Sequence, residues 1–283
     1  MKDRITGLDF HQTFKPERNC INSLLSDISE CSGKTIADIS KITGIPAGKS
    51  SGKVLPTICY AEYMGLIHSK LSNGKYILDY TDIGKVVVDE DPGLSEERTL
   101  LLLHCMLVRK NSGALLWAYI ICDLLPKYHN EINKLTLEKE LSLRFKKDVN
   151  VAPFNGTYMS LFQQLDVVEI QNSFYIVHSH LYNSEFIYLY GLVLYEYWED
   201  WVNSFDNKEQ ELRKISLSEI TAEQIEETGF RHPFGWSKND EYAVLEALND
   251  KGVIALNRQM SPFAVRKIMK KENLIDQLYS ELC

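Results

Sequence analysis

Apolar and polar positions change period along the segment 35–91, which predicts two helices followed by a β-hairpin. Isoleucines recur at helical spacing from Ile36 to Ile42, and Thr35 before them suits the N-cap of this helix. Gly44 suits its end. A second helix is predicted at about 55–65, after a short stretch of small and basic residues.

Strands are predicted after the second helix, on either side of the dipeptide Asn73-Gly74. This dipeptide favours a two-residue hairpin turn because both of its residues tolerate positive φ. Helix, turn, helix and hairpin therefore follow one another in the order of a winged helix-turn-helix, a unit that places a helix in a DNA groove. We expect such a DNA-binding domain over residues 1–91.

Two later stretches of the chain repeat parts of this pattern. Residues 134–178 predict an amphipathic helix, a second helix and a small hairpin with Asn172 and Ser173 at its turn. Residues 232–256 predict the last helix and first strand of a similar unit. Between these stretches, the aromatic run at 186–201 predicts a central core helix or a protein interface. The chain therefore predicts a mainly α protein with small β-hairpins, of the α+β class. The expected domains are a winged helix at 1–91, a helical domain at 92–205 with a second winged helix in it, and a winged-helix-like unit at 206–283.

Charge is distributed unevenly along the 283 residues, whose formal net charge is -8. An acidic chain does not suit a protein that coats nucleic acid nonspecifically, because such binding depends on neutralising phosphates. Residues 34–78 differ from this average, since they hold six lysines against only Asp38 and Glu62, a local charge of +4. We expect DNA contacts to lie in this segment.

The loop between the first two predicted helices resembles part of a nucleotide-binding loop. Gly48, Lys49 and Ser50 match the end of the phosphate-loop pattern, but Thr43 occupies the place of its leading glycine and the preceding segment has helical spacing. Pro56 also interrupts the long helix that should follow. We therefore interpret the loop as a turn that approaches a DNA backbone. The residues expected to contact DNA are Lys41, Lys49, Ser50, Ser51, Lys53, Thr57, Lys70 and Lys75.

A second group of basic residues lies near the end of the sequence. Two interpretations stay open for it, a solvated basic surface and a second phosphate-contacting surface. Its members are Arg258, Arg266, Lys267 and Lys270.

The sequence predicts no catalytic residue, no metal site and no cofactor. His11 lies between two phenylalanines and His104 lies on a strongly apolar helix, so we expect both to be packed core residues. His178 and His180 share a strand face, but no third metal ligand has an obvious place. The acidic run at 89–91 suits a helix start, although a metal-dependent hydrolase or nuclease that uses it with His11 and His104 stays a weaker alternative.

Cysteine usage and hydropathy indicate the compartment. The six cysteines include no C-x-x-C pair, and several lie in apolar runs where reduced, buried thiols are common. No apolar segment after Met1 predicts a signal peptide, and charged residues interrupt the most apolar runs. We expect a cytoplasmic protein that makes no membrane contact.

Several sequence blocks stand out along the chain. They are FHQTF at 10–14, GIPAGKSSGKVLPTICYAEYMGLI at 44–67, TDIGKVVVDEDPGLSEERTLLLLHCML at 81–107, and FGWSKNDEYAVLEAL with NRQMSPFAVRKI near the end. In this order they resemble the bacterial family catalogued as domain of unknown function 4007, over nearly the whole chain. Members of that family tend to lie beside DNA phosphorothioation and other phage-defence genes, so the resemblance implies DNA handling and names no catalytic residue. Gln12 stands where the first block implies an acidic residue.

The leading hypothesis from the sequence is a non-enzymatic component that binds or targets DNA in a bacterial defence or phosphorothioation-linked DNA-modification system. Its expected partners are double-stranded DNA and proteins of such a complex, and the sequence leaves the oligomeric state open. The alternative is a protein-interaction scaffold without direct DNA contact, in which the aromatic segment 186–201 docks a partner enzyme.

Overall fold

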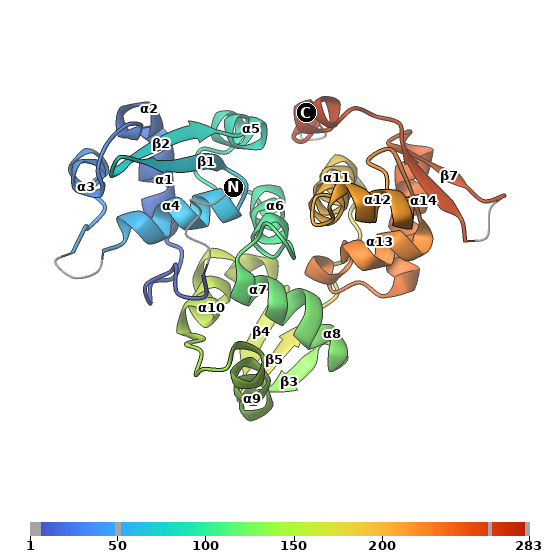
Figure 1. Cartoon of the computed structure of the whole chain (residues 1–283), viewed down its shortest axis with the longest axis horizontal. Coiled ribbons are helices and arrows are strands. Elements are labelled where there is room, and N and C mark those ends of the chain that lie inside the picture. The colour runs from blue at the N-terminus through green and yellow to red at the C-terminus, as the bar shows by residue number, and fades with distance from the viewer. Residues whose placement is uncertain (1–6, 49–51, 260–261, 281–283) are drawn as a thin grey trace.

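The computed structural model describes residues 7–48, 52–259 and 262–280 (Figure 1). The protein belongs to the α+β class, because helices dominate and the strands form small antiparallel sheets. Three lobes lie around central helices: an N-terminal lobe (residues 18–80, blue to cyan), a middle lobe (115–177, green to yellow) and a C-terminal lobe (207–267, orange to red). The expected class is confirmed.

The N-terminal lobe contains the predicted helices and hairpin. The Thr35 side chain accepts a hydrogen bond from the Asp38 N–H at 3.3 Å, and Gly44 ends that helix with a φ of 72°. Asn73 and Gly74 form the hairpin turn with φ values of 51° and 74°. These local predictions are confirmed. The elements are α1 (Arg18–Ser26), α2 (Ile28–Cys31), α3 (Ile36–Thr43), α4 (Val54–Tyr63), β1 (Ile67–Ser72) and β2 (Lys75–Tyr80).

The middle lobe has a comparable set of elements. Its hairpin turns at Asn172 and Ser173, as predicted, with φ values of 49° and 66°. The elements are α7 (Leu115–Ala118), the π-helix η1 (Tyr119–Leu124), α8 (Leu125–Lys127), β3 (Glu131–Asn133), α9 (Lys134–Phe145), α10 (Ala152–Gly156), the π-helix η2 (Thr157–Leu161), the 3₁₀-helix η3 (Gln163–Leu165), β4 (Val168–Gln171) and β5 (Phe174–Val177).

The C-terminal lobe repeats the arrangement once more. Its helix α14 and strand β7 are the helix and strand that the sequence predicts there. The elements are α12 (Asn207–Arg213), β6 (Glu219–Thr221), α13 (Ala222–Thr228), the 3₁₀-helix η5 (His232–Phe234), α14 (Lys238–Asp250), β7 (Ile254–Asn257) and β8 (Ala264–Lys267), followed by α15 (Lys271–Asp276).

All three lobes share one topology. In the middle and C-terminal lobes the last strand is central, with sheet orders β3-β5-β4 and β6-β8-β7. In the N-terminal lobe the single bridge between Lys34 and Tyr76 takes the place of the first strand. A polar side chain then caps the helix that follows the first strand or bridge, and these caps are Thr35, Asn133 and Thr221.

Two buried helices, α6 (Glu97–Leu107) and α11 (Ile187–Val202), join the lobes and contact each other. The aromatic residues of α11 belong to the core, since Tyr190 and Trp198 are 0% exposed and Tyr195 and Tyr197 are 1% exposed. These aromatic side chains are therefore packed in the core of the protein. Helix α5 (Asp82–Glu90) and the 3₁₀-helix η4 (Ser184–Phe186) complete the connections. Within the described ranges no helix is long and apolar enough to cross a membrane.

Candidate nucleic-acid interface

Helix α4, the predicted DNA-reading helix, is buried. Of its residues only Leu55 and Glu62 are partly exposed, because the segment VLPTICYAEY is apolar around most of its circumference. The N-terminal block FHQTF covers one side: Phe10 lies edge-on to the ring of Tyr60, with 5.0 Å between ring centroids, and the Tyr60 hydroxyl donates to the Phe14 carbonyl at 2.9 Å. Helix α4 therefore presents no open face to a DNA groove.

Thr57, which the sequence predicts to contact DNA, lies on this buried helix. Its side chain is 5% exposed, and its hydroxyl donates to the backbone carbonyl of Lys53 at 2.7 Å. In the described structure the Thr57 side chain is therefore engaged within the protein.

Lys53, another predicted DNA contact, is paired within the protein. Its Nζ lies 2.7 Å from Oε1 of Glu17, and both side chains are only about a third exposed, at 30% and 35%. The hydrogen bond from Lys53 lowers the pKa of Glu17, and the same bond raises the pKa of Lys53. Lys53 thus neutralises a carboxylate instead of extending toward solvent.

The loop before α4 is closed at its base. The Lys53 N–H donates to the Pro46 carbonyl at 2.8 Å, and a Cβ at Gly52 would come within 1.7 Å of the Ala47 carbonyl oxygen. This close approach explains why a glycine is needed at position 52. The predicted contacts Lys49, Ser50 and Ser51 lie outside the described residues.

The exposed basic residues of the N-terminal lobe lie on α3 and on the hairpin. Only Ile39 of α3 is buried, and the Lys41 side chain is 80% exposed, 3.8 Å from Asp38. Lys70 and Lys75 are exposed and share the solvent side of the hairpin, since the register pairs them with Ile77 and Ser72. Tyr76 and Leu78 point to the opposite, buried side. We call the exposed lysines Lys41, Lys70 and Lys75 the lysine face.

Backbone pairing places the two parts of the lysine face next to each other. Lys34 bridges to Tyr76, which neighbours Lys75, and α3 begins two residues after Lys34. Figure 1 shows the turn of the hairpin beside α3. Within the described part of the chain, Lys34, Lys70 and Lys75 have no ion-pair partner.

The second basic group does not form one surface. Arg258 pairs with Glu246, and Lys267 lies 3.0 Å from Glu199 with its ammonium 4.5 Å from the ring centre of Tyr195. Burial lowers the pKa of Lys267. Among the residues the structure describes, only Arg266 and Lys270 of this group are exposed without a carboxylate partner.

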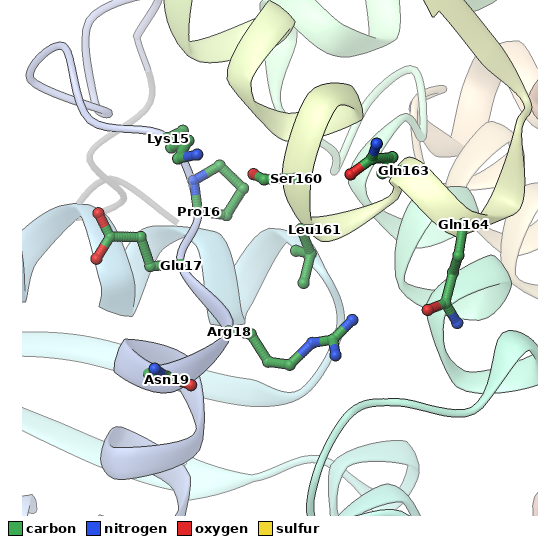
Figure 2. A pocket seen from close by; sticks show the side chains of 9 residues that line it. All are labelled: Lys15, Pro16, Glu17, Arg18, Asn19, Ser160, Leu161, Gln163 and Gln164. Carbon is green, nitrogen blue, oxygen red and sulfur yellow. The ribbon is translucent and has the colours of Figure 1, made fainter.

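A cleft of about 910 Å³ opens where the N-terminal lobe meets the middle lobe (Figure 2). It contains two cations, Lys15 and Arg18, that the sequence reasoning did not single out. The available signal was the basic pair in KPER, directly after the block FHQTF. The cleft is lined by Lys15, Pro16, Glu17, Arg18, Asn19, Ser160, Leu161, Gln163 and Gln164.

His11 and His104 occupy structural positions. His104 is fully buried, with Nε2 at 3.0 Å from the Pro233 carbonyl and Nδ1 at 3.2 Å from the Tyr158 hydroxyl, and burial lowers its pKa to about 4. Nδ1 of His11 accepts a hydrogen bond from the Thr13 N–H at 3.0 Å. Both histidines therefore pack in the core, as expected.

The other candidate acid–base groups also have local partners. The Asp91 carboxylate accepts hydrogen bonds from the N–H groups of Ser95 and Glu96, each at 2.9 Å, and so serves the start of α6. His178 contacts Glu169 at 2.8 Å. Among the described residues no group of three or more His, Cys, Asp or Glu side chains could hold a metal ion.

Fold and surface together define a mostly helical α+β protein of three similar lobes, the first of which carries the lysine face. No family model matches the sequence, and no curated protein matches it. Two crystal structures of SspB, one of them bound to a magnesium ion, have a similar fold. Each shares 14% sequence identity with this chain at a TM-score of 0.67, over 99% of this chain and 88% of the SspB chain. At this identity the likeness shows a shared fold.

Proposed function

We propose that this protein binds double-stranded DNA through the lysine face, as a non-enzymatic component of a bacterial defence or phosphorothioation-linked DNA-modification system. The observation that supports the proposal best is the hairpin β1–β2. It holds Lys70 and Lys75 on one solvent side, beside α3 and Lys41. Ammonium groups in such a position contact phosphates and release counterions.

The order of elements supports interpreting each lobe as a winged helix, with β1–β2 as the wing of the first. In a typical winged helix the second helix enters the major groove and reads bases. Here that helix, α4, is buried. The proposed contacts are therefore directed to the DNA backbone, and they position the protein without reading sequence.

The biological setting in this proposal comes from the resemblance to domain of unknown function 4007, whose members tend to lie beside phosphorothioation and phage-defence genes. The SspB structures support a common architecture. One of them holds magnesium, but in this protein Asp91 caps the start of α6 and His104 packs in the core. The proposal therefore contains no metal-dependent step.

The test is a salt-titrated binding assay on plain and phosphorothioated duplexes with the triple variant Lys41→Ala/Lys70→Ala/Lys75→Ala. Each lost phosphate contact lowers the slope of log K against log salt by about 0.9, so we expect a slope that is smaller by about 2 to 3. We expect an affinity loss of at least about tenfold at ~50 mM salt.

The matched control is Lys134→Ala/Lys139→Ala/Lys208→Ala. These lysines are also exposed, and Lys134 lies 3.8 Å from Glu138 just as Lys41 lies 3.8 Å from Asp38. The control removes the same net charge from helices α9 and α12. Equal losses in the two triple variants, or binding that does not depend on salt, would contradict the proposal.

A further inference from the structure

The cleft at the junction of two lobes has a positive charge that none of the described residues compensates. Its N-terminal side is the segment 15–19, which leads into α1, and its other side is formed by η2 and η3 of the middle lobe. Lys15 is exposed and Arg18 is partly exposed, and neither has a hydrogen-bond or ion-pair partner among the described residues. Figure 2 shows the Arg18 guanidinium between Leu161 and Gln164, within the cleft.

The one carboxylate in the lining does not cancel this charge. Glu17 is paired with Lys53 at 2.7 Å, and Figure 2 shows its carboxylate turned away from Arg18 and Ser160. Lys53 therefore has a role that the sequence did not predict, because it holds Glu17 neutralised and leaves Lys15 and Arg18 available. The N-terminus of α1 adds positive potential, since no side chain caps it.

The middle lobe helps to hold the cations in place. A Cβ at Gly156 would lie 2.8 Å from Cδ of Lys15, so the Lys15 stem packs directly against this glycine. Gln164 donates from Nε2 to the Ser95 carbonyl at 2.9 Å, which fixes the side chain at the edge of the cleft. The cleft is thus built from both lobes, with ordered neighbours around its cations.

We propose that this cleft binds phosphate groups of a nucleic-acid strand or of a free nucleotide, with Arg18 as one ligand and Lys15 as another at a separate place along the cleft (Figure 2). A guanidinium suits two phosphate oxygens at once, and an ammonium and helix N–H groups add to the attraction. Among the described residues, none of those that line the cleft has an aromatic side chain on which a base could stack. Recognition is therefore directed to the backbone, with the amides of Asn19 and Gln163 available to neighbouring sugar or base groups.

This site lies apart from the lysine face and does not depend on it. The volume of about 910 Å³ exceeds that of one phosphate ion and suits a short stretch of strand. A single strand that follows this cleft would contact both the N-terminal and the middle lobe. The inference thus extends the proposed function with a second phosphate site.

The test measures binding of three probes to the full chain at ~50 mM salt: inorganic phosphate, thymidine monophosphate and a tetrathymidylate strand. The variants are Arg18→Gln and Lys15→Gln, and the control is Lys208→Gln on α12. We expect each cleft variant to weaken at least one probe by about tenfold or more, as for the loss of a charge-assisted hydrogen bond, while the control leaves binding unchanged. Unchanged thermal unfolding midpoints verify that the variants fold.

The probes also distinguish the sources of the phosphate. Binding of thymidine monophosphate as tight as that of the strand identifies a nucleotide site, and tighter binding of the strand identifies a strand-binding cleft. Failure of all three probes to bind, or equal binding by wild type and both cleft variants, would overturn the inference. The triple variant of the lysine face separates the two proposals: if it alone loses duplex binding and no cleft variant affects any probe, the proposed function stands and the cleft does not bind phosphate.

Discussion

At the scale of single residues, the pairing of Lys53 with Glu17 decides which cations stay available. The sequence places Lys53 among small and basic residues, a composition that predicts backbone contact with DNA. The structure instead brings it to a carboxylate 36 positions earlier in the chain. No local pattern identifies such a partner, because it depends on how α1 and α4 pack together.

We expect the variant Lys53→Met to lose less than about 1 kcal/mol of unfolding free energy at pH 7, since the pair is about a third exposed and solvent screens it. The pKa of Glu17 is lowered in the folded protein. The ionised Glu17 carboxylate therefore stabilises the folded protein fully at pH values above 4.5, its pKa in the unfolded chain. This stabilisation is lost as the pH falls through the lower pKa of Glu17 in the folded protein.

Urea unfolding at pH 7 and at about pH 3 measures this difference. The difference in unfolding free energy between Lys53→Met and wild type should be smaller at the acid pH than at pH 7. The variant Glu17→Gln and the double variant complete a mutant cycle, whose coupling energy isolates the pair. A coupling energy near zero at pH 7 would show that the pair does not act as described. The same Lys53→Met variant should also weaken phosphate binding in the cleft.

At the scale of elements, sequence patterns predict where helices and hairpins form. They predict less well which faces of these elements are exposed to solvent. The capped helix α3, the turn at Asn73 and the turn at Asn172 each depend on residues adjacent in sequence, so local chemistry was sufficient. The burial of α4 depends on the distant block FHQTF and on α6. Because α4 is apolar all round, its sequence does not indicate which side faces the core. The first hairpin and α3 therefore carry the exposed lysines, and α4 does not.

The repeated caps after the first strand or bridge of each lobe make a testable set. We expect Thr35→Ala, Asn133→Ala and Thr221→Ala each to lower the unfolding free energy by about 1 kcal/mol, because each removes the acceptor for a free N–H at a helix start. Chemical denaturation measures the loss.

The control for the caps is Thr136→Ala, which lies within α9 and accepts no capping bond through its side chain. Alanine favours helix interiors, so this change should be neutral or slightly stabilising. If a cap variant loses no more unfolding free energy than this control, the cap does not stabilise its lobe.

At the scale of the whole molecule, an ion cluster connects the C-terminal lobe to the central helices. Glu196 and Glu199 of α11 meet three cations from distant parts of the chain. Arg109 follows α6, Lys267 lies in β8 and Lys271 begins α15. Two of the basic side chains near the end of the sequence thus face the core and hold lobes together, which composition alone does not reveal.

We expect Glu199→Ala to cost roughly 3 kcal/mol of unfolding free energy, since it leaves Lys267 with a 14% exposed side chain and no carboxylate at its previous distance of 3.0 Å. The double variant Glu199→Ala/Lys267→Met should recover part of this loss, because it removes the buried ammonium that has lost its carboxylate. Denaturant unfolding followed by tryptophan fluorescence measures both.

The exposed Glu211→Ala on α12 is the control, with an expected change within about 0.5 kcal/mol. If Glu199→Ala and Glu211→Ala destabilise equally, the ion cluster does not join the lobes energetically.

The burial of α4 also has an evolutionary consequence. Residues of a DNA-reading helix diverge when target sequences diverge, but Tyr60 and its neighbours here are constrained by the rings packed around them. Among descendants of a common ancestor, α4 should therefore keep its apolar character while hairpin positions such as Lys70 and Lys75 drift between lysine and arginine. If the lysine face binds DNA as proposed, selection on this lobe would preserve its charge and shape and leave the choice of DNA sequence to another molecule.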